Sequence, residues 1–239
     1  MAATPIQRMF APVKRIAPRW LSETIRSCGT ACLTPFYFSA RSGHFRSSLR
    51  RAAVTPAGNP LPWYTFPCIE FLALRDFTGK SVLEFGGGQS SVWWAGRAAS
   101  VLTFEGDPAW HRRIRDSMPA NVDLRLVTSS TPEERVAEIR AAIGDGPARR
   151  FDVVVIDGLD RRLLVPLACE LLAEGGVIIC DNAEGYGFHD ALKGRGLSRV
   201  DFYGHAPGVI LPHSTSIAFR SGSWVFEHDS APIRVEYGW

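Results

Sequence analysis

No run of apolar residues in the sequence approaches the roughly 18 to 20 that a membrane-spanning helix needs. Cysteine is scarce: five are scattered along the 239 residues, and Cys68, Cys169 and Cys180 lie in apolar surroundings, as buried reduced thiols do. Cys28 and Cys32 have no second pair of metal ligands nearby, which argues against a zinc site. Arginines interrupt the N-terminus, so it lacks the long apolar core of a secretory signal. These absences predict a cytoplasmic protein with one substantial core.

Acidic residues are almost missing from the N-terminal part of the chain. Nine Lys/Arg against a single acid give residues 1–53 a net charge of +8, so the remainder carries −5. We therefore expect a basic N-terminal extension over 1–53 and a folded domain over 54–239. Apolar residues recur at roughly helical spacing in the first 27 residues, although Pro12 and Pro18 should interrupt a continuous helix.

Such an arm is open to three interpretations. Residues 1–27 could make a peripheral contact with an anionic membrane or an acidic partner protein. They could instead pack on the domain or on a second subunit, or act as an organellar transit peptide. No feature of the sequence indicates an oligomeric state.

From residue 81 onward, short apolar runs alternate with longer amphipathic ones. Near-continuous Val/Ile/Leu runs indicate strands that are buried on both faces, as in a parallel sheet covered by helices. After residue 182 two further strands follow each other with at most one short helix before them, which indicates an antiparallel hairpin at a sheet edge. The expected strands are 81–85, 101–105, 122–127, 151–157, 175–181, 199–204 and 214–220, and the expected helices are 91–97, 108–118, 131–143 and 162–173. The predicted fold is α/β: a Rossmann-like, doubly wound, mostly parallel seven-stranded sheet with a C-terminal antiparallel hairpin.

Three consecutive glycines follow the first predicted strand in the stretch SVLEFGGGQSS, residues 81–91. Missing side chains let a ligand approach the backbone at the carboxyl edge of the sheet, where open α/β sheets bind ligands. A phosphate-binding loop would end in Gly-Lys-Ser/Thr, and a dinucleotide fingerprint would have glycine where Ser91 stands. Glu105 ends the second strand, 21 residues after Glu84, and a carboxylate there can bind both hydroxyls of a ribose. The pattern favours S-adenosylmethionine, with a dinucleotide still open.

Four stretches in order, LEFGGGQSS, LTFEGD, FDVVVIDG and LLAEGGVIICDN, resemble those of class I S-adenosylmethionine-dependent methyltransferases. The resemblance covers roughly residues 60–220. The segments PLPWYTFPCIEFL, GQSSVWWA and VDFYGHAPG…HSTSIAFR are more specifically similar to a little-characterised bacterial group, some of which accompany polysaccharide or surface-glycan biosynthesis. One departure is Ser90, which takes the last place of the family's Gly-x-Gly-x-Gly.

The resemblance implies a role for each matching residue. Glu84 would bind near the amino group of the methionine moiety, the glycines would let that moiety lie against the loop, and Glu105 would hold the ribose. The adenine region has only the polar residues 128–130 after the third strand, and Asp157 would lie near the methionine end or the acceptor. Trp93 and Trp94 are expected to pack in the core. The implied cofactor-binding residues are Glu84, Gly86, Gly87, Gly88, Glu105, Ser129 and Asp157.

Methyl transfer to a hydroxyl needs an aligned acceptor and a group that removes or depresses its proton. One candidate device is a side-chain base: His189 or Asp190 after the fifth strand, or His205 or His213 in the hairpin loop, with His205 as the first choice. The other is a hard cation such as Mg²⁺, held by Asp157, Asp181 and Asn182 at the ends of adjacent strands. The second arrangement is similar to the metal site of catechol-type O-methyltransferases. Asp-Asn after a strand also serves as a turn or helix cap, so both devices stay open.

The favoured function is methyl transfer from S-adenosylmethionine to oxygen of a small molecule or glycan, with Asp157, Asp181 and His205 as catalytic residues. The alternatives are another Rossmann-type enzyme, either a nicotinamide-dependent oxidoreductase or an aminopropyltransferase-like enzyme, and a non-catalytic scaffold of the same fold. Nucleic acid is not expected as a partner, because the positive charge lies in the extension while the rest of the chain is acidic.

Overall fold

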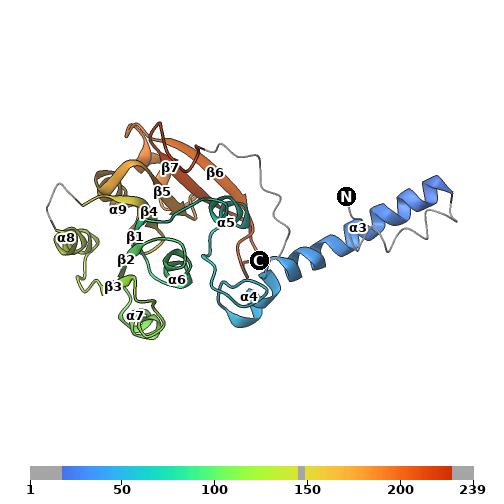
Figure 1. Cartoon of the computed structure of the whole chain (residues 1–239), viewed down its shortest axis with the longest axis horizontal. Coiled ribbons are helices and arrows are strands. Elements are labelled where there is room, and N and C mark those ends of the chain that lie inside the picture. Colours follow the sequence, from blue (N-terminus) through green and yellow to red (C-terminus); the bar gives the residue numbers. More distant parts are fainter. Residues whose placement is uncertain (1–17, 145–148, 228–239) are drawn as a thin grey trace.

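A computed structural model describes residues 18–144 and 149–227 (Figure 1). They form one seven-stranded sheet in the order β3-β2-β1-β4-β5-β7-β6. The first five strands are parallel, while β7 pairs antiparallel with both β5 and β6. The strands are β1 (Ser81–Phe85), β2 (Ser100–Glu105), β3 (Val122–Leu126), β4 (Phe151–Ile156), β5 (Leu172–Asp181), β6 (Ser198–Gly204) and β7 (His213–Phe219). The predicted fold class is confirmed.

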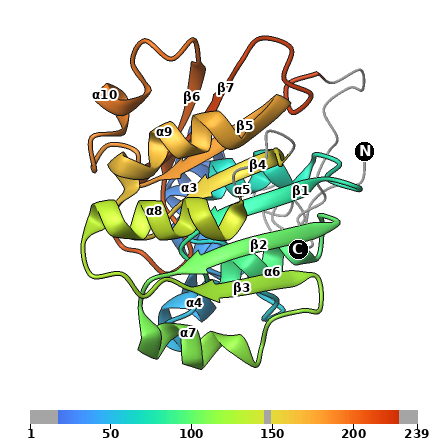
Figure 2. The same ribbon diagram turned by 90° about the vertical axis from the view of Figure 1, so that its left-hand side faces the viewer.

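Helices cover both faces of the sheet, as buried apolar strands require. In Figure 2, α8 and α9 lie on the face turned toward the viewer and α6 lies behind. Alternate residues of a strand enter different cores: Leu83 packs in one cluster with α8 and α9, and Val82 packs in the other with α5 and α6. The helices are α3 (Arg19–Arg41), α4 (His44–Arg50), α5 (Phe66–Ala73), α6 (Gln89–Ala95), α7 (Pro108–Arg115), α8 (Pro132–Ile143), α9 (Arg161–Leu171) and α10 (Phe188–Leu192).

Most expected bounds agree with the structure to within one to three residues. Helix α8 begins behind a reciprocal cap, because the Thr131 hydroxyl accepts the Glu134 N–H and the Glu134 carboxylate accepts the Thr131 N–H. Helix α9 ends at Leu171, two residues earlier than expected, because β5 begins at Leu172.

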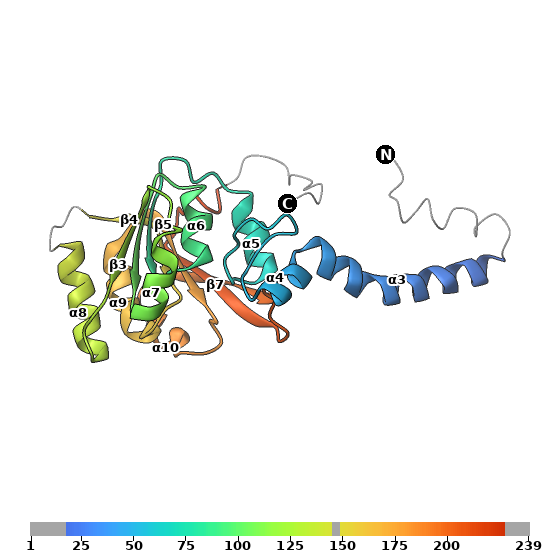
Figure 3. The ribbon, with the colours of Figure 1, turned by 90° about the horizontal axis from the view of Figure 1, so that it is seen from below.

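The main difference lies in the N-terminal extension. Pro18 was expected to interrupt a helix, and α3 begins directly after it; the unexpected feature is that α3 then continues for 23 residues through Pro35. A proline is tolerated at the start of a helix because the first N–H groups have no intrahelical partner anyway. None of the α3 residues is buried, and the helix projects away from the sheet (Figures 1 and 3). Residues 1–17, which include Pro12, lie outside the described residues.

Helix α4 joins this projecting helix to the sheet domain. The Ser47 hydroxyl donates to the carbonyl of Val54 and accepts its N–H. The ring of His44 lies 3.2 Å from the carbonyl oxygen of Ala206, in the loop between β6 and β7. Among the described residues no helix is both long and apolar enough to cross a membrane.

Candidate functional site

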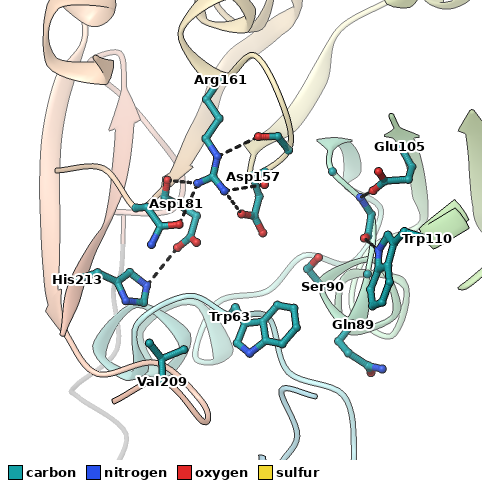
Figure 4. A pocket seen from close by; sticks show the side chains of 15 residues that line it. Trp63, Gln89, Ser90, Glu105, Trp110, Asp157, Arg161, Asp181, Val209 and His213 are labelled. Carbon is teal, nitrogen blue, oxygen red and sulfur yellow. Dashed lines mark hydrogen bonds and ion pairs between the residues drawn. The ribbon is translucent and has the colours of Figure 1, made fainter. Parts of the chain in front are cut away.

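A cavity of about 390 Å³ opens at the carboxyl ends of β1, β4 and β5 (Figure 4). It lies where β1 has β2 on one side and β4 on the other, the switch in strand order at which α/β sheets bind ligands. One half is lined by the glycine loop with its neighbours, and the other half by residues that follow β4, β5 and the β6–β7 loop. The lining residues are Trp63, Gly86, Gly87, Gly88, Gln89, Ser90, Glu105, Trp110, Asp157, Gly158, Arg161, Asp181, Asn182, Val209 and His213.

The three glycines line the cavity for different physical reasons. Gly86 has a φ of +99°, and a β-carbon there would lie 2.6 Å from the backbone of Gly158. A β-carbon on Gly87 would lie 2.8 Å from the Thr103 methyl group. At Gly88 the nearest atom is 3.9 Å away, on Trp110, so only this glycine leaves open space inside the cavity. The first two glycines allow the loop to pack on the sheet, and the third leaves room for a ligand.

Glu105 is buried at the end of β2 and holds the glycine loop in place. Its Oε2 accepts the N–H of Gly87 at 3.0 Å, and its Oε1 accepts the N–H of Asp107 at 2.7 Å. The Trp110 indole donates to the carbonyl oxygen of Gly87 at 2.7 Å, from the other side of the loop. Trp110 was not predicted as a site residue, although its place in the helix directly after Glu105 was available as a signal.

Glu84 lies in the sheet beneath the loop and does not line the cavity. Its Oε2 accepts from the hydroxyls of Ser91 and Thr103, while its Oε1 has no hydrogen-bond partner among the described residues. Burial raises the pKa of this carboxyl to about 7, against the opposing effect of the neighbouring hydroxyls. Its predicted contact with the cofactor stays a prediction. Ser129 also lies outside the cavity, and its N–H donates to Glu138. Its expected contact with the cofactor is likewise still a prediction.

The acceptor edge brings Asp157, Asp181 and Asn182 together, and a guanidinium lies among them. Arg161, at the start of α9, points its side chain back across the ends of β4 and β5 (Figure 4). Its Nη2 donates to the carbonyl oxygen and to Oδ1 of Asp157, both at 2.9 Å. Its Nη1 donates to the carbonyl oxygen of Asp181 at 2.6 Å and to Oδ1 of Asn182 at 3.2 Å. Its Nε donates to Gly158 at 3.0 Å, so all five N–H groups are used.

The residues predicted to bind Mg²⁺ do not fit that ion in this arrangement. Arg161 already occupies Oδ1 of Asp157 and Oδ1 of Asn182, and the Thr215 hydroxyl donates to Oδ1 of Asp181 at 2.9 Å. A dication at this edge would stand beside a buried guanidinium of the same sign. Within 18–144 and 149–227, no group of three or more His, Cys, Asp or Glu side chains has a geometry suited to a metal ion. The cation at this edge is Arg161, which sequence reasoning missed because its acceptors are mostly backbone carbonyls.

Two acids and an imidazole face the same space beside Arg161. Burial raises the pKa of Asp157 well above its usual range, and the nearby Asp181 carboxyl raises it further while Arg161 opposes both. Asp181 also lies beside His213, with Oδ1 3.7 Å from Nε2, and this contact raises the pKa of the imidazole. Both shifts favour the protonated forms of groups that line the cavity.

The structure separates the candidate histidines. His213 is buried and lines the cavity, whereas His205, the first choice from the sequence, is exposed and does not line it. The carbonyl oxygen of His205 instead accepts the N–H of Phe66 at 2.8 Å, which joins the hairpin loop to α5. His189 and Asp190 are exposed on α10, outside the cavity. His213 replaces His205 as the histidine that the geometry can use.

The aromatic residues near the site divide between core and cavity. Trp93 and Trp94 are buried in the core, as expected, and the Trp94 indole donates to the Tyr64 hydroxyl at 3.1 Å. Tyr64 and Thr65 are buried and do not line the cavity. Trp63, the residue before them, lines it beside the acceptor edge (Figure 4).

No family model matches the chain, and no curated protein matches it either. Among solved structures, it is similar to the O-methyltransferase TomG from Streptomyces achromogenes, which is involved in tomaymycin synthesis and was crystallised with S-adenosylmethionine. The identity is 18%, the TM-score is 0.53, and the match covers 77% of this chain and 88% of TomG. An O-methyltransferase from Bacillus cereus in complex with S-adenosylhomocysteine matches at 16% identity and a TM-score of 0.48, over 75% of this chain and 90% of its own. At these identities the likeness concerns the fold: the chain has the fold of a class I methyltransferase.

Proposed function

We propose that this protein is an S-adenosylmethionine-dependent methyltransferase that acts on oxygen of a small molecule or glycan. The observation that carries the proposal is the Glu105 carboxylate beside the glycine loop. The Gly87 N–H donates to the Glu105 carboxylate, and that carboxylate lines the cavity. S-adenosylmethionine has a cationic sulfonium, an ammonium group and two ribose hydroxyls, and each of these is favoured beside a carboxylate. The open space at Gly88 gives such a ligand room against the loop.

The same loop disfavours a nicotinamide dinucleotide. Pyrophosphate sites use free backbone N–H groups, which point at the ligand from the loop and the following helix. Here the Gly87 N–H is bound to Glu105, and the Gly88 N–H is bound to the Ser91 hydroxyl at 3.1 Å. A pyrophosphate at this place would meet a carboxylate of its own sign instead of free donors.

The cavity supplies a proton-accepting edge opposite the glycine loop. When bound, S-adenosylmethionine supplies a methyl group on a positively charged sulfur. Asp157 lines the cavity, and burial raises its pKa, which makes its carboxylate a stronger base toward a hydroxyl proton. Asp181 lies 3.7 Å from Nε2 of His213 and favours the protonated imidazole, a form that can donate a hydrogen bond to the acceptor. Arg161 fixes the loops after β4 and β5 that carry both acids.

Replacing Glu105 by alanine tests the cofactor assignment. We expect Glu105→Ala to weaken S-adenosylhomocysteine binding by about 2 kcal/mol or more, roughly 30-fold, because charge-assisted hydrogen bonds to the ribose are lost. Isothermal titration calorimetry measures this directly. Asp123→Ala is the matched control, since this acid lies on the neighbouring strand β3, is bound to Arg125 and does not line the cavity.

Two results would contradict the assignment. One is equal affinity of the wild type and Glu105→Ala for S-adenosylhomocysteine. The other is a wild-type protein that binds NAD and ignores S-adenosylhomocysteine, which would favour the oxidoreductase alternative. Circular dichroism of both variants checks that the fold is retained.

A further inference from the structure

Helix α3 has one charged side and one uncharged side. Arg19, Glu23 and Arg26 follow each other at spacings of four and three residues, so they share one side of the helix. The opposite side contains apolar and small residues at the same helical spacing. These are Leu21, Ile25, Cys28, Cys32 and Phe36. No α3 residue is buried, so the chain itself leaves this apolar side uncovered within the described residues.

The charge of this region has one sign. Residues 19–51 contain six arginines and one acid, Glu23, which gives a net charge of +5. Glu23 is moreover bound to Arg19 at 2.9 Å. A strongly basic segment with an uncovered apolar side can bind a surface that has negatively charged groups outside and an apolar interior.

The apolar exposure continues from α3 to the rim of the cavity. On α4, Phe45 and Leu49 are exposed. The β6–β7 loop lies beside this helix, because the Gly208 N–H contacts the His44 ring at 3.3 Å. In that loop Val209 lines the cavity, while the next two residues, Ile210 and Leu211, are 85% and 71% exposed. Leucine and isoleucine side chains this exposed, next to a basic helix pair, are unusual for a surface that meets only water.

We propose that α3, α4 and the loop tip Ile210–Leu211, here called the basic apolar surface, bind an anionic lipid bilayer. Helix α3 would lie in the plane of the interface with its apolar side in the acyl boundary and its arginines toward the headgroups. It would not cross the bilayer, in keeping with the absence of a spanning helix among the described residues. The binding surface would then begin at the mouth of the cavity, on the side formed by Val209.

Other partners fit the same residues less well. A second copy of this chain that paired through α3 would bring two segments of net charge +5 together. A nucleic acid would satisfy the arginines but leave the Ile25 and Phe36 side in water. A bilayer with acidic lipids satisfies both sides of the helix at once.

Vesicle co-sedimentation of the full chain tests the proposal. We expect binding to vesicles of phosphatidylcholine with phosphatidylglycerol at low salt, and binding at least tenfold weaker to phosphatidylcholine alone. Added salt should weaken the binding without abolishing it, because screening removes the electrostatic part and leaves the apolar part.

A pair of double variants separates the two sides of α3. Ile25→Ser with Phe36→Ser removes one aliphatic and one aromatic side chain from the apolar side, and should weaken vesicle binding more than tenfold. Leu33→Ser with Tyr37→Ser removes a comparable pair from the side that carries Arg26, and should change binding less than threefold. All four side chains are exposed, so both variants should keep the far-ultraviolet spectrum and thermal midpoint of the wild type.

Three outcomes would overturn the proposal: no binding of the wild type to anionic vesicles at low salt, equal losses in the two double variants, or a dimer in sedimentation equilibrium that only Ile25→Ser with Phe36→Ser dissociates. The last would assign the apolar side to a second copy of the chain. The vesicle measurements do not involve the cofactor, so they stand or fall independently of the proposed methyl transfer.

Discussion

Replacing Gly86 by alanine should destabilise the sheet domain by about 3 kcal/mol or more, because two costs add at one atom. The residue has a φ of +99°, a conformation that a side chain makes unfavourable. The new β-carbon would also lie 2.6 Å from the Gly158 N and Cα atoms, which are backbone atoms at the end of β4 and cannot move aside cheaply. Relief requires β1 and β4 to separate at their carboxyl ends, where the cavity begins. Urea unfolding measures the loss.

Gly88→Ala is the matched control in the same loop. Its β-carbon would meet nothing closer than Trp110 at 3.9 Å, and the backbone there is extended, with a φ of 175°. Stability should therefore change by no more than about 0.5 kcal/mol. The added methyl group enters the cavity, so the affinity for S-adenosylhomocysteine should fall instead. Equal stability losses at the two positions would show that the loop does not divide its glycines between packing and binding.

The sequence predicts the sheet well because each strand is specified locally. Apolar runs bounded by polar or glycine residues mark the parallel strands other than β3, whose VDLRL alternates apolar and charged residues, and the change after residue 182 marks the antiparallel hairpin. The convergence of Asp157, Asp181 and Asn182 was also predictable, since the carboxyl ends of adjacent parallel strands must meet at one edge.

What the sequence does not predict depends on atoms that come together only in the folded chain. Arg161 lies one residue before the helix predicted over 162–173, and its backbone acceptors have no signature in the sequence. His205 and His213 stand in one loop, and the hairpin register, which pairs Gly204 with His213, decides which enters the cavity. The length of α3 was missed because Pro35 lies inside it, and an interior proline weighs against a helix.

Replacing Arg161 by alanine should destabilise the protein by about 3 kcal/mol or more, because it leaves the Asp157 carboxylate without its cation and three backbone carbonyls without this donor. The loss should also depend on pH. Without the guanidinium, the pKa of Asp157 should rise further above its unfolded value, since Arg161 is the group that opposes burial and the Asp181 charge. A carboxyl with a raised folded pKa contributes stability at low pH, and that contribution is lost as the pH rises through the folded pKa. The difference between the wild type and Arg161→Ala should therefore grow as the pH increases above the folded pKa of Asp157 in the wild type, which already lies well above the usual range of an aspartic acid.

The matched control is Arg135→Ala, which removes an arginine of α8 bound at 2.6 Å to Asp160, the residue directly before α9. Arg135→Ala should lower the free energy of unfolding by less than Arg161→Ala does. This loss of stability should change little with pH, because no second acid is left unpaired beside Asp160. A parallel pH dependence in the two variants would contradict the role given to Arg161.

Adding or removing Mg²⁺ tests the role of Arg161 at this edge most directly. In the wild type, neither excess Mg²⁺ nor EDTA should move the thermal midpoint, because the guanidinium uses the oxygen atoms that an ion would need. In Arg161→Ala those oxygens of Asp157 and Asn182 are released beside the Asp181 carboxyl, and the alanine leaves space for a hydrated ion. Mg²⁺ should then raise the midpoint of the variant in proportion to its occupancy, since a ligand that binds only the folded state stabilises it. If Mg²⁺ stabilises the wild type as much as the variant, the ion can displace Arg161 at this edge, and the prediction of a metal site is supported. If it stabilises the variant alone, one arginine replaces the metal that the sequence pattern of acids predicts.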